Sequence, residues 1–210
     1  MHKTIMINTI GEPGAGKSTF SFWLVYELKR RGIRAEFVPE VVKYETYSED
    51  RVRRLLSTII DQRLMVRQHR FVQPLLGHTE VIVNDGPLTS FFYYSQLNMP
   101  ADRFAQMRRL MDRYMDEQHA GADVRYVTPV RSHPYDGHGR YHSEAESREV
   151  RGQLLHSLKH TFGIHPLVLG DDAMRQRFAD DLIAEVLHLR QATEPSHQTT
   201  ARTHKPRRQP

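Results

Sequence analysis

The stretch Ile5-Met6-Ile7-Asn8-Thr9-Ile10-Gly11-Glu12-Pro13-Gly14-Ala15-Gly16-Lys17-Ser18 decides how this chain folds. Residues 5–10 form an apolar run typical of a strand, and residues 11–18 match the phosphate-binding pattern G-x-x-x-x-G-K-[ST] in full. The glycines permit backbone angles that a side chain would forbid, so successive N–H groups can converge on phosphate oxygens. The N-terminus of the helix expected at 17–31 would add a favourable dipole for an anion. The segment therefore predicts nucleoside triphosphate binding.

The loop also assigns individual roles. Lys17 is expected to reach the terminal phosphates, and the Ser18 hydroxyl to ligate Mg²⁺. We expect ATP and Mg²⁺ as the ligands, although the pattern itself fits ATP and GTP equally. The residues expected to bind the nucleotide are Gly11, Glu12, Pro13, Gly14, Ala15, Gly16, Lys17, Ser18 and Thr19.

Length and composition favour one α/β domain. The chain has 210 residues and no cysteine, which excludes a disulfide framework and a thiolate metal site. No segment approaches the roughly 20 apolar residues of a membrane helix, and no apolar signal segment precedes the first strand. These features lead us to expect a cytoplasmic protein.

The net charge of +5 is concentrated in the last residues. We expect a kinase-like domain over residues 1–191 and a disordered basic tail over 192–210, because the tail has several prolines and no apolar pattern. Two interpretations of the tail stay open: contact with a nucleic-acid backbone, or a solvated segment with no task. Its charged residues are Glu194, Arg202, Lys205, Arg207 and Arg208.

Strand and helix patterns alternate along the whole domain. This alternation predicts an α/β protein with three layers, in which a five-stranded parallel sheet carries helices on both faces. Ser143 and Glu146 form a capping box for one helix, and Gly32 follows the end of the first. The expected strands are 3–10, 34–39, 80–85, 124–130 and 163–169, and the expected helices are 17–31, 49–71, 87–97, 101–119, 143–161 and 172–190.

Two carboxylates directly follow predicted strands, where ligands of parallel sheets bind. Asp85 comes after Val81-Ile82-Val83-Asn84, and we expect it to organise Mg²⁺. The alternative is that it caps the helix starting near Pro87. Glu40 ends the second strand and is a candidate general base for an acceptor hydroxyl, or simply a polar residue at a strand end.

Two arginine-rich segments complete the candidate site. Residues 131–140, Arg131-Ser-His-Pro-Tyr-Asp-Gly-His-Gly-Arg140, are typical of a lid over about 131–142 that delivers Arg131 and Arg140 to a transferring phosphoryl group, or of a basic surface loop. The histidines nearby match no tight zinc pattern. The helix at 49–71 carries six arginines, which form a solvated face or line an anionic acceptor groove.

These motifs together resemble a phage-type group of small phosphate-loop kinases. The resemblance spans residues 1 to about 190 and depends on the phosphate loop, Val38-Pro39-Glu40, Asn84-Asp85-Gly86-Pro87-Leu88, and the lid with Glu144-Ala-Glu146. Some members look like 5-hydroxymethyluridine DNA kinases, and the likeness extends more weakly to deoxynucleoside and nucleotide kinases. Gly86 departs from the pattern, because many nucleotide kinases have an arginine there, and Asp136 replaces a common asparagine.

The resemblance implies an ATP-dependent kinase acting on a hydroxyl of a nucleoside unit. We expect the acceptor to be the 5-hydroxymethyl group of 5-hydroxymethyluracil in phage DNA, a step in thymidine hypermodification. The alternatives are a kinase of a free nucleoside or nucleotide, and a nucleotide-dependent switch or DNA-binding ATPase without an acceptor. Glu40 and Asp85 both stay candidates for the base that takes the proton.

Overall fold

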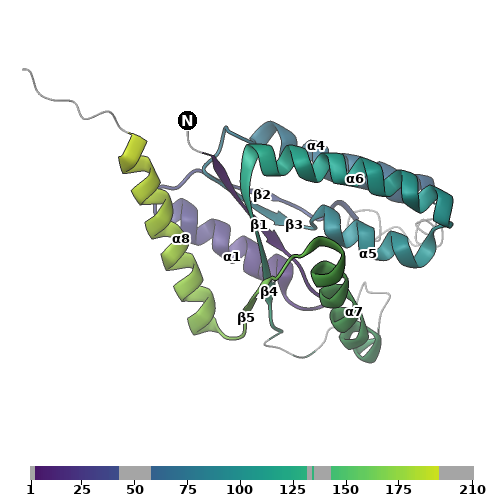
Figure 1. The fold of residues 1–210 in the computed structure, drawn as a ribbon. Helices are drawn as coiled ribbons and strands as arrows, with labels where there is room; N and C mark the ends of the chain where they lie inside the picture. The colour runs from purple at the N-terminus through teal and green to yellow at the C-terminus, as the bar shows by residue number, and fades with distance from the viewer. Residues whose placement is uncertain (1–2, 43–57, 132–133, 135–142, 194–210) are drawn as a thin grey trace, which may run out of the picture.

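A computed structural model describes residues 3–42, 58–131, 134 and 143–193. The predicted α/β architecture is confirmed: one parallel sheet has the strand order β2-β3-β1-β4-β5, with helices on both faces (Figure 1). The strands are β1 (Thr4–Thr9), β2 (Ala35–Val38), β3 (Val81–Asp85), β4 (Ala122–Pro129) and β5 (Leu167–Leu169). The helices are α1 (Lys17–Arg30), α4 (Thr58–Val72), the short 3₁₀ helix η1 (Gln73–Leu75), α5 (Leu88–Asn98), α6 (Ala101–Gly121), α7 (Glu144–Phe162) and α8 (Asp172–Thr193).

Two predicted element boundaries differ from the observed ones by three residues or more. The strand expected at 163–169 pairs only over β5, because Gly163 ends α7 with φ +65° and Ile164 donates its amide back to the Leu158 carbonyl. Helix α8 continues to Thr193, two residues into the expected tail. The tail from 194 onward, and the expected helix start at 49–57, lie outside the described residues.

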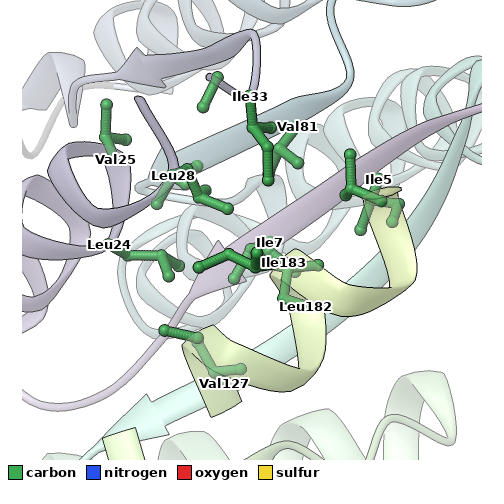
Figure 2. Close-up of a cluster of buried hydrophobic side chains, with 14 of the residues drawn as sticks. Ile5, Ile7, Leu24, Val25, Leu28, Ile33, Val81, Val127, Leu182 and Ile183 are labelled. Carbon is green, nitrogen blue, oxygen red and sulfur yellow. The ribbon is translucent and has the colours of Figure 1, made fainter. Parts of the chain in front are cut away.

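The core lies on both faces of the sheet because strand side chains alternate in direction. Ile5 and Ile7 of β1 pack with Leu24 and Leu28 of α1 and with Leu182 of α8 on one face (Figure 2). On the other face of the sheet, Met6 of β1 and Ile82 of β3 form a second buried cluster with Val72, the last residue of α4. Double-sided burial explains why the strands read as continuous apolar runs.

The strand order creates a crevice at the carboxyl ends of β1 and β3. These two strands are neighbours, but the chain leaves β1 toward β2 on one side and leaves β3 toward β4 on the other. Loops that depart in opposite directions from adjacent strands open a ligand-binding crevice between them. Residues 11–18 follow β1 and residues 86–87 follow β3, so both sequence motifs meet at this point.

None of the described helices is both long enough and apolar enough to span a lipid bilayer.

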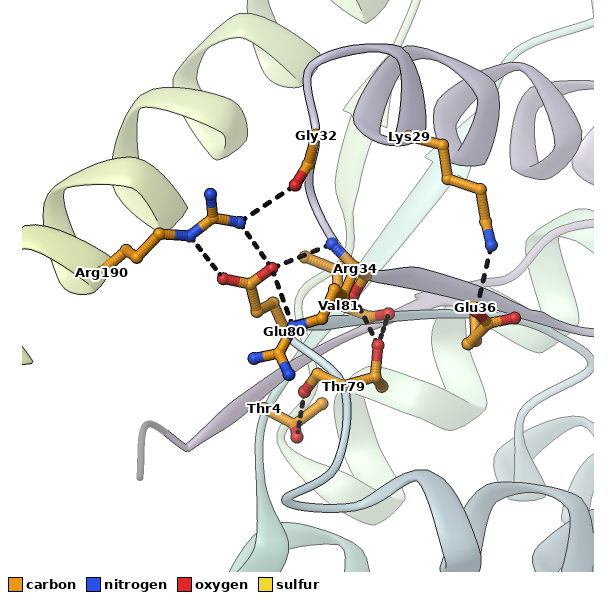
Figure 3. Close-up of polar contacts among 9 residues, drawn as sticks. All are labelled: Thr4, Lys29, Gly32, Arg34, Glu36, Thr79, Glu80, Val81 and Arg190. Carbon is orange, nitrogen blue, oxygen red and sulfur yellow. Dashed lines mark hydrogen bonds and ion pairs between the residues drawn. The ribbon is translucent and has the colours of Figure 1, made fainter.

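The opposite end of the sheet is tied to helix α8 by Glu80. This carboxylate accepts hydrogen bonds from Arg190 Nε at 2.9 Å and Nη2 at 2.8 Å, and from the Arg34 amide at 2.9 Å (Figure 3). Arg190 Nη2 also donates to the Gly32 carbonyl at 3.1 Å. Burial opposes ionisation of Glu80, but the hydrogen bonds from Arg190 and Arg34 outweigh it and lower the pKa below its ordinary value of 4.5. The last helix is therefore fixed to the strands by a charged cluster.

We expect Glu80→Gln to lower the free energy of unfolding by about 2 kcal/mol near neutral pH, because it weakens charge-assisted hydrogen bonds at a side chain only 8% exposed. A carboxylate with a lowered folded pKa contributes stability above its unfolded pKa, and this contribution is lost as pH falls through the folded pKa. Denaturant titrations at about pH 7 and about pH 3 should therefore show a smaller stability difference between wild type and variant at the lower pH. Glu36→Gln, in an exposed pair with Lys29, is the control and should change little. An equal loss at both pH values would contradict the role given to the charge.

Candidate functional site

The phosphate loop has the geometry that its sequence predicts. Gly16 at the N-cap of α1 has φ +84°, a left-handed conformation that glycine adopts without strain. Lys17 follows, and its Nζ donates to the carbonyl oxygens of Gly11 and Glu12 at 3.0 Å each. The ammonium group therefore lies back over the loop, among the main-chain groups of residues 11–16.

Helix α7 braces this loop from a distant part of the chain. Ser147 Oγ donates to the Pro13 carbonyl at 2.6 Å, and Arg151 Nη1 lies 3.7 Å from Glu12 Oε1. Glu12 is a buried residue of the loop itself, so its carboxylate lies close to the site expected to hold an anion. The Arg151 guanidinium offsets that negative charge. Sequence reasoning missed both Ser147 and Arg151.

Ser18 and Asp85, the predicted metal ligands, are brought together. Ser18 Oγ donates to Asp85 Oδ2 at 2.5 Å, and Thr9 Oγ1 donates to Asp85 Oδ1 at 3.4 Å. The alternative role of Asp85 as a helix cap is not observed: the N-cap of α5 is Pro87, with no side-chain cap hydrogen bond. Hydroxyl and carboxylate oxygens are the ligand types that Mg²⁺ prefers, so this pair fits that ion.

Glu40 lies on the same rim, against the backbone of Gly86. Gly86 has φ +127°, and a Cβ placed on it would lie 3.0 Å from the Cα, Cβ and Cγ of Glu40. The absence of a side chain at Gly86 is therefore what lets Glu40 approach the residue that follows Asp85. The two predicted carboxylates occupy neighbouring strand ends, as expected from their positions in the sequence.

Tyr94 on α5 is a further residue near Glu40. Burial, with the negative charge of Glu40 adding to it, raises the pKa of Tyr94. Its phenol therefore stays neutral at physiological pH. Sequence reasoning did not single out this residue, because Phe91-Phe92-Tyr93-Tyr94 is typical of a buried helix face.

The predicted lid lies mostly outside the described residues, and Arg140 is among those not described. Arg131 is described, and its Nη2 donates to Glu144 Oε1 at 2.6 Å. The predicted capping box is confirmed: Glu146 donates its amide to Ser143 Oγ at 3.3 Å, and Ser143 donates its amide to Glu146 Oε2 at 2.7 Å. Glu144, the first residue of α7, therefore holds the Arg131 side chain in place.

A cavity of about 410 Å³ opens beside the phosphate loop. Such a volume is typical of a small-molecule site. Arg175 borders the cavity and is held by Asp172 Oδ1 at 2.7 Å and by the Val130 carbonyl at 2.5 Å. The lining residues of the cavity are Ala15, Gly16, Thr19, Phe20, Trp23, Asp172, Arg175 and Gln176.

Among solved structures, the overall fold resembles that of NadR. The fold of the NadR protein in complex with NAD and AMP-PNP superimposes with a TM-score of 0.61 at 15% sequence identity, covering 92% of this chain and 51% of that chain. The NadR protein in complex with NR gives a TM-score of 0.57 at 18% identity, with 88% and 52% covered. This likeness confirms the predicted fold, a five-stranded parallel sheet with helices on both faces.

The chain spans about half the length of these NadR structures. At such low identity the likeness concerns the fold. No protein-family model and no curated protein matches the sequence. The chemistry of the site must therefore be argued from its own residues.

Proposed function

We propose that this protein is an ATP-dependent phosphotransferase whose acceptor is a hydroxyl group of a nucleoside unit. The observation that carries this proposal is the convergence of three features on one rim: the phosphate loop with Lys17, the Ser18–Asp85 pair, and the carboxylate of Glu40 beside Gly86. An anion site, a site for its counter-ion and a proton acceptor are the parts that phosphoryl transfer needs. The NadR structure that contains AMP-PNP, an analogue of ATP, supports the choice of nucleotide.

In the proposed reaction, the acceptor oxygen forms a bond to the γ-phosphorus of ATP while the bond from that phosphorus to the β–γ bridging oxygen breaks, releasing ADP. Main-chain amides of residues 11–18 would bind the phosphates, and Lys17 would offset the negative charge that develops on the transferred group. Ser18 and Asp85 would hold Mg²⁺, which supplies charge neutralisation at the β- and γ-phosphates. Arg131, and Arg140 from the lid, would contribute further positive charge.

We assign the acceptor proton to Glu40. Asp85 is buried, and its two carboxylate oxygens already accept hydrogen bonds from Ser18 and Thr9, as expected of a residue that orders the metal site. Glu40 is only partly buried and lies one strand further out, so an acceptor hydroxyl can reach it. This division of roles gives each carboxylate one task.

The cavity beside the loop would take the base of ATP. Trp23 lines it and is the single tryptophan of the chain, so it reports on this cavity alone. We expect ATP to change the Trp23 fluorescence in a saturable way, because a bound base alters the polarity around the indole. Inorganic triphosphate, which lacks a base, is the control and should bind without this change. An unaltered emission at ATP concentrations that support turnover would contradict the placement of the base.

For the acceptor, we propose the 5-hydroxymethyl group of 5-hydroxymethyluracil in DNA. Support comes from the resemblance of the loop, strand-end and lid motifs to phage-type kinases, and from exposed arginines on α4 that suit a phosphate backbone. These are Arg63, Arg67 and Arg70. A base within a duplex must be flipped out or presented single-stranded to reach Glu40. A free nucleoside or nucleotide is the second candidate acceptor, favoured by the NadR structure that contains NR.

The test is transfer of labelled γ-phosphate from ATP to a set of acceptors. We expect label in DNA that contains 5-hydroxymethyluracil and none in the same DNA with thymine, with activity that falls steeply as salt rises. Label in free nucleosides or nucleotides alone, at a rate insensitive to salt, would replace the DNA acceptor with the second candidate. ADP formation without a labelled acceptor would identify a nucleotide-dependent switch or ATPase and overturn the kinase proposal.

A further inference from the structure

Gln68 on α4 holds the backbone on both sides of Glu40. Its Oε1 accepts the Val41 amide at 2.9 Å, and its Nε2 donates to the Pro39 carbonyl at 3.0 Å. Pairing between β2 and β3 ends at Val38 and Asn84, so residues 39–41 have left the strand ladder at this point. The Gln68 amide therefore replaces the neighbouring strand as the hydrogen-bond partner of this turn.

The same side chain connects the turn to the centre of the sheet. Gln68 Nε2 also donates to Asn84 Oδ1 at 2.9 Å, and Asn84 Nδ2 donates to Asn8 Oδ1 at 2.7 Å. A continuous chain of side-chain amides thus extends from α4 through β3 to β1. Asn84 precedes Asp85, and Asn8 precedes Thr9, which contacts Asp85. The amide chain consequently joins the backbone that carries Glu40 to the two strands that carry the metal site.

All three amides are fully buried, with exposed fractions of 0% for Gln68 and Asn84 and 1% for Asn8. Burying an amide costs free energy unless its hydrogen bonds are satisfied, and apolar side chains would fill the same space without that requirement. A satisfied buried network specifies one arrangement of the elements that it joins. Here the elements are the turn with Glu40 and the strand end with Asp85.

We infer that Gln68 is a positioning residue that sets the Glu40 carboxylate relative to Asp85 for phosphoryl transfer. The inference rests on the proposed function. The Glu40 side chain packs against Gly86, which is possible because Gly86 has no Cβ. Gln68 holds the peptide groups on both sides of Glu40 by hydrogen bonds. Loss of the Gln68 amide would leave the turn free to shift by a fraction of an ångström, which is enough to weaken proton transfer.

The experiment compares Gln68→Met, which keeps the length of the side chain and removes its hydrogen bonds, with Gln62→Met at an exposed position of the same helix. We expect Gln68→Met to lower kcat about 10-fold, since small displacements of catalytic groups have effects of this order. The affinity for ATP, measured by Trp23 fluorescence, should be unchanged. Gln62→Met should leave kcat unchanged. If Gln68→Met does not fold at the assay temperature, Gln68→Asn, which keeps an amide but shortens its reach, takes its place.

A double-mutant cycle with Glu40→Gln separates positioning from a general structural role. If Gln68 acts through the Glu40 carboxylate, Gln68→Met should lower kcat less than about 2-fold once that carboxylate is gone, because coupled residues are not additive. If Gln68→Met lowers kcat by the same factor with and without the Glu40 carboxylate, or does not lower kcat at all, the inference about Gln68 is overturned. The proposed function still stands in that case, provided that the wild-type protein transfers phosphate to a hydroxyl. Absence of transfer by wild type to any hydroxyl would overturn both.

Discussion

Lys17→Ala should abolish most phosphoryl transfer, lowering kcat by about 10²–10³-fold, the loss typical of removing one preorganised group that stabilises developing charge. Lys17 Nζ lies within 3.0 Å of two carbonyl oxygens of the phosphate loop, so its charge is already at the anion site before a nucleotide arrives. Such preorganisation is worth more in the transition state than in the ground state. The affinity for ATP should therefore fall less than kcat does.

Lys29→Ala is the matched control for this prediction. It makes the same substitution on the same helix, but Lys29 Nζ pairs with Glu36 Oε1 at 3.0 Å on an exposed surface far from the loop. Label transfer from ATP and ATP-induced Trp23 fluorescence, measured for both variants, give kcat and affinity. A Lys17→Ala variant that turns over at the wild-type rate would remove the basis of the proposed function.

The fold and the rim of the site could be predicted from the sequence because both depend on local patterns. β1 and β3 are short, fully buried and mostly apolar runs, and in a parallel sheet the residues that follow the strands meet at one edge. Ser18 ends the phosphate loop, Asp85 ends β3, and Glu40 lies two residues after β2, so their convergence needed no knowledge of helix packing. Glu40 lies 3.0 Å from the point where a Cβ on Gly86 would be, next to Asp85, which is consistent with that reasoning.

The residues that support the rim could not be predicted in this way. Ser147 and Arg151 contact the phosphate loop only because α7 packs beside it, more than 130 residues along the chain. Gln68 did leave a signal, since it lies four residues after Leu64 and four before Val72, on the buried face of α4. A glutamine at a position where the helix pattern expects an apolar side chain indicates a buried polar partner. The partners themselves, Pro39 and Asn84, follow only from the packing of α4 on the sheet.

Gly86→Ala should lower kcat about 10-fold, because a methyl group at this position forces Glu40 to shift on the rim. The added Cβ would lie 3.0 Å from the Cα of Glu40 as well as from its Cβ and Cγ, so the backbone of the turn must move. Relief of these contacts takes a shift of a few tenths of an ångström, and small displacements of a catalytic group have effects of about this size. The positive φ of +127° adds strain of about 1–3 kcal/mol, which should appear as a lower free energy of unfolding.

Gly32→Ala separates the two effects. Gly32 also has a positive φ, +74°, but a Cβ there would meet nothing within 4 Å. The variant should therefore lose stability through backbone strain while keeping its kcat, whereas Gly86→Ala should lose both. Denaturant unfolding and label transfer, measured on the same preparations, give the two quantities. Equal kcat values for Gly86→Ala and wild type would contradict the role of Glu40 as the acceptor of the proton. Asp85 would then take that role, because its hydrogen bonds to Ser18 and Thr9 do not involve Gly86.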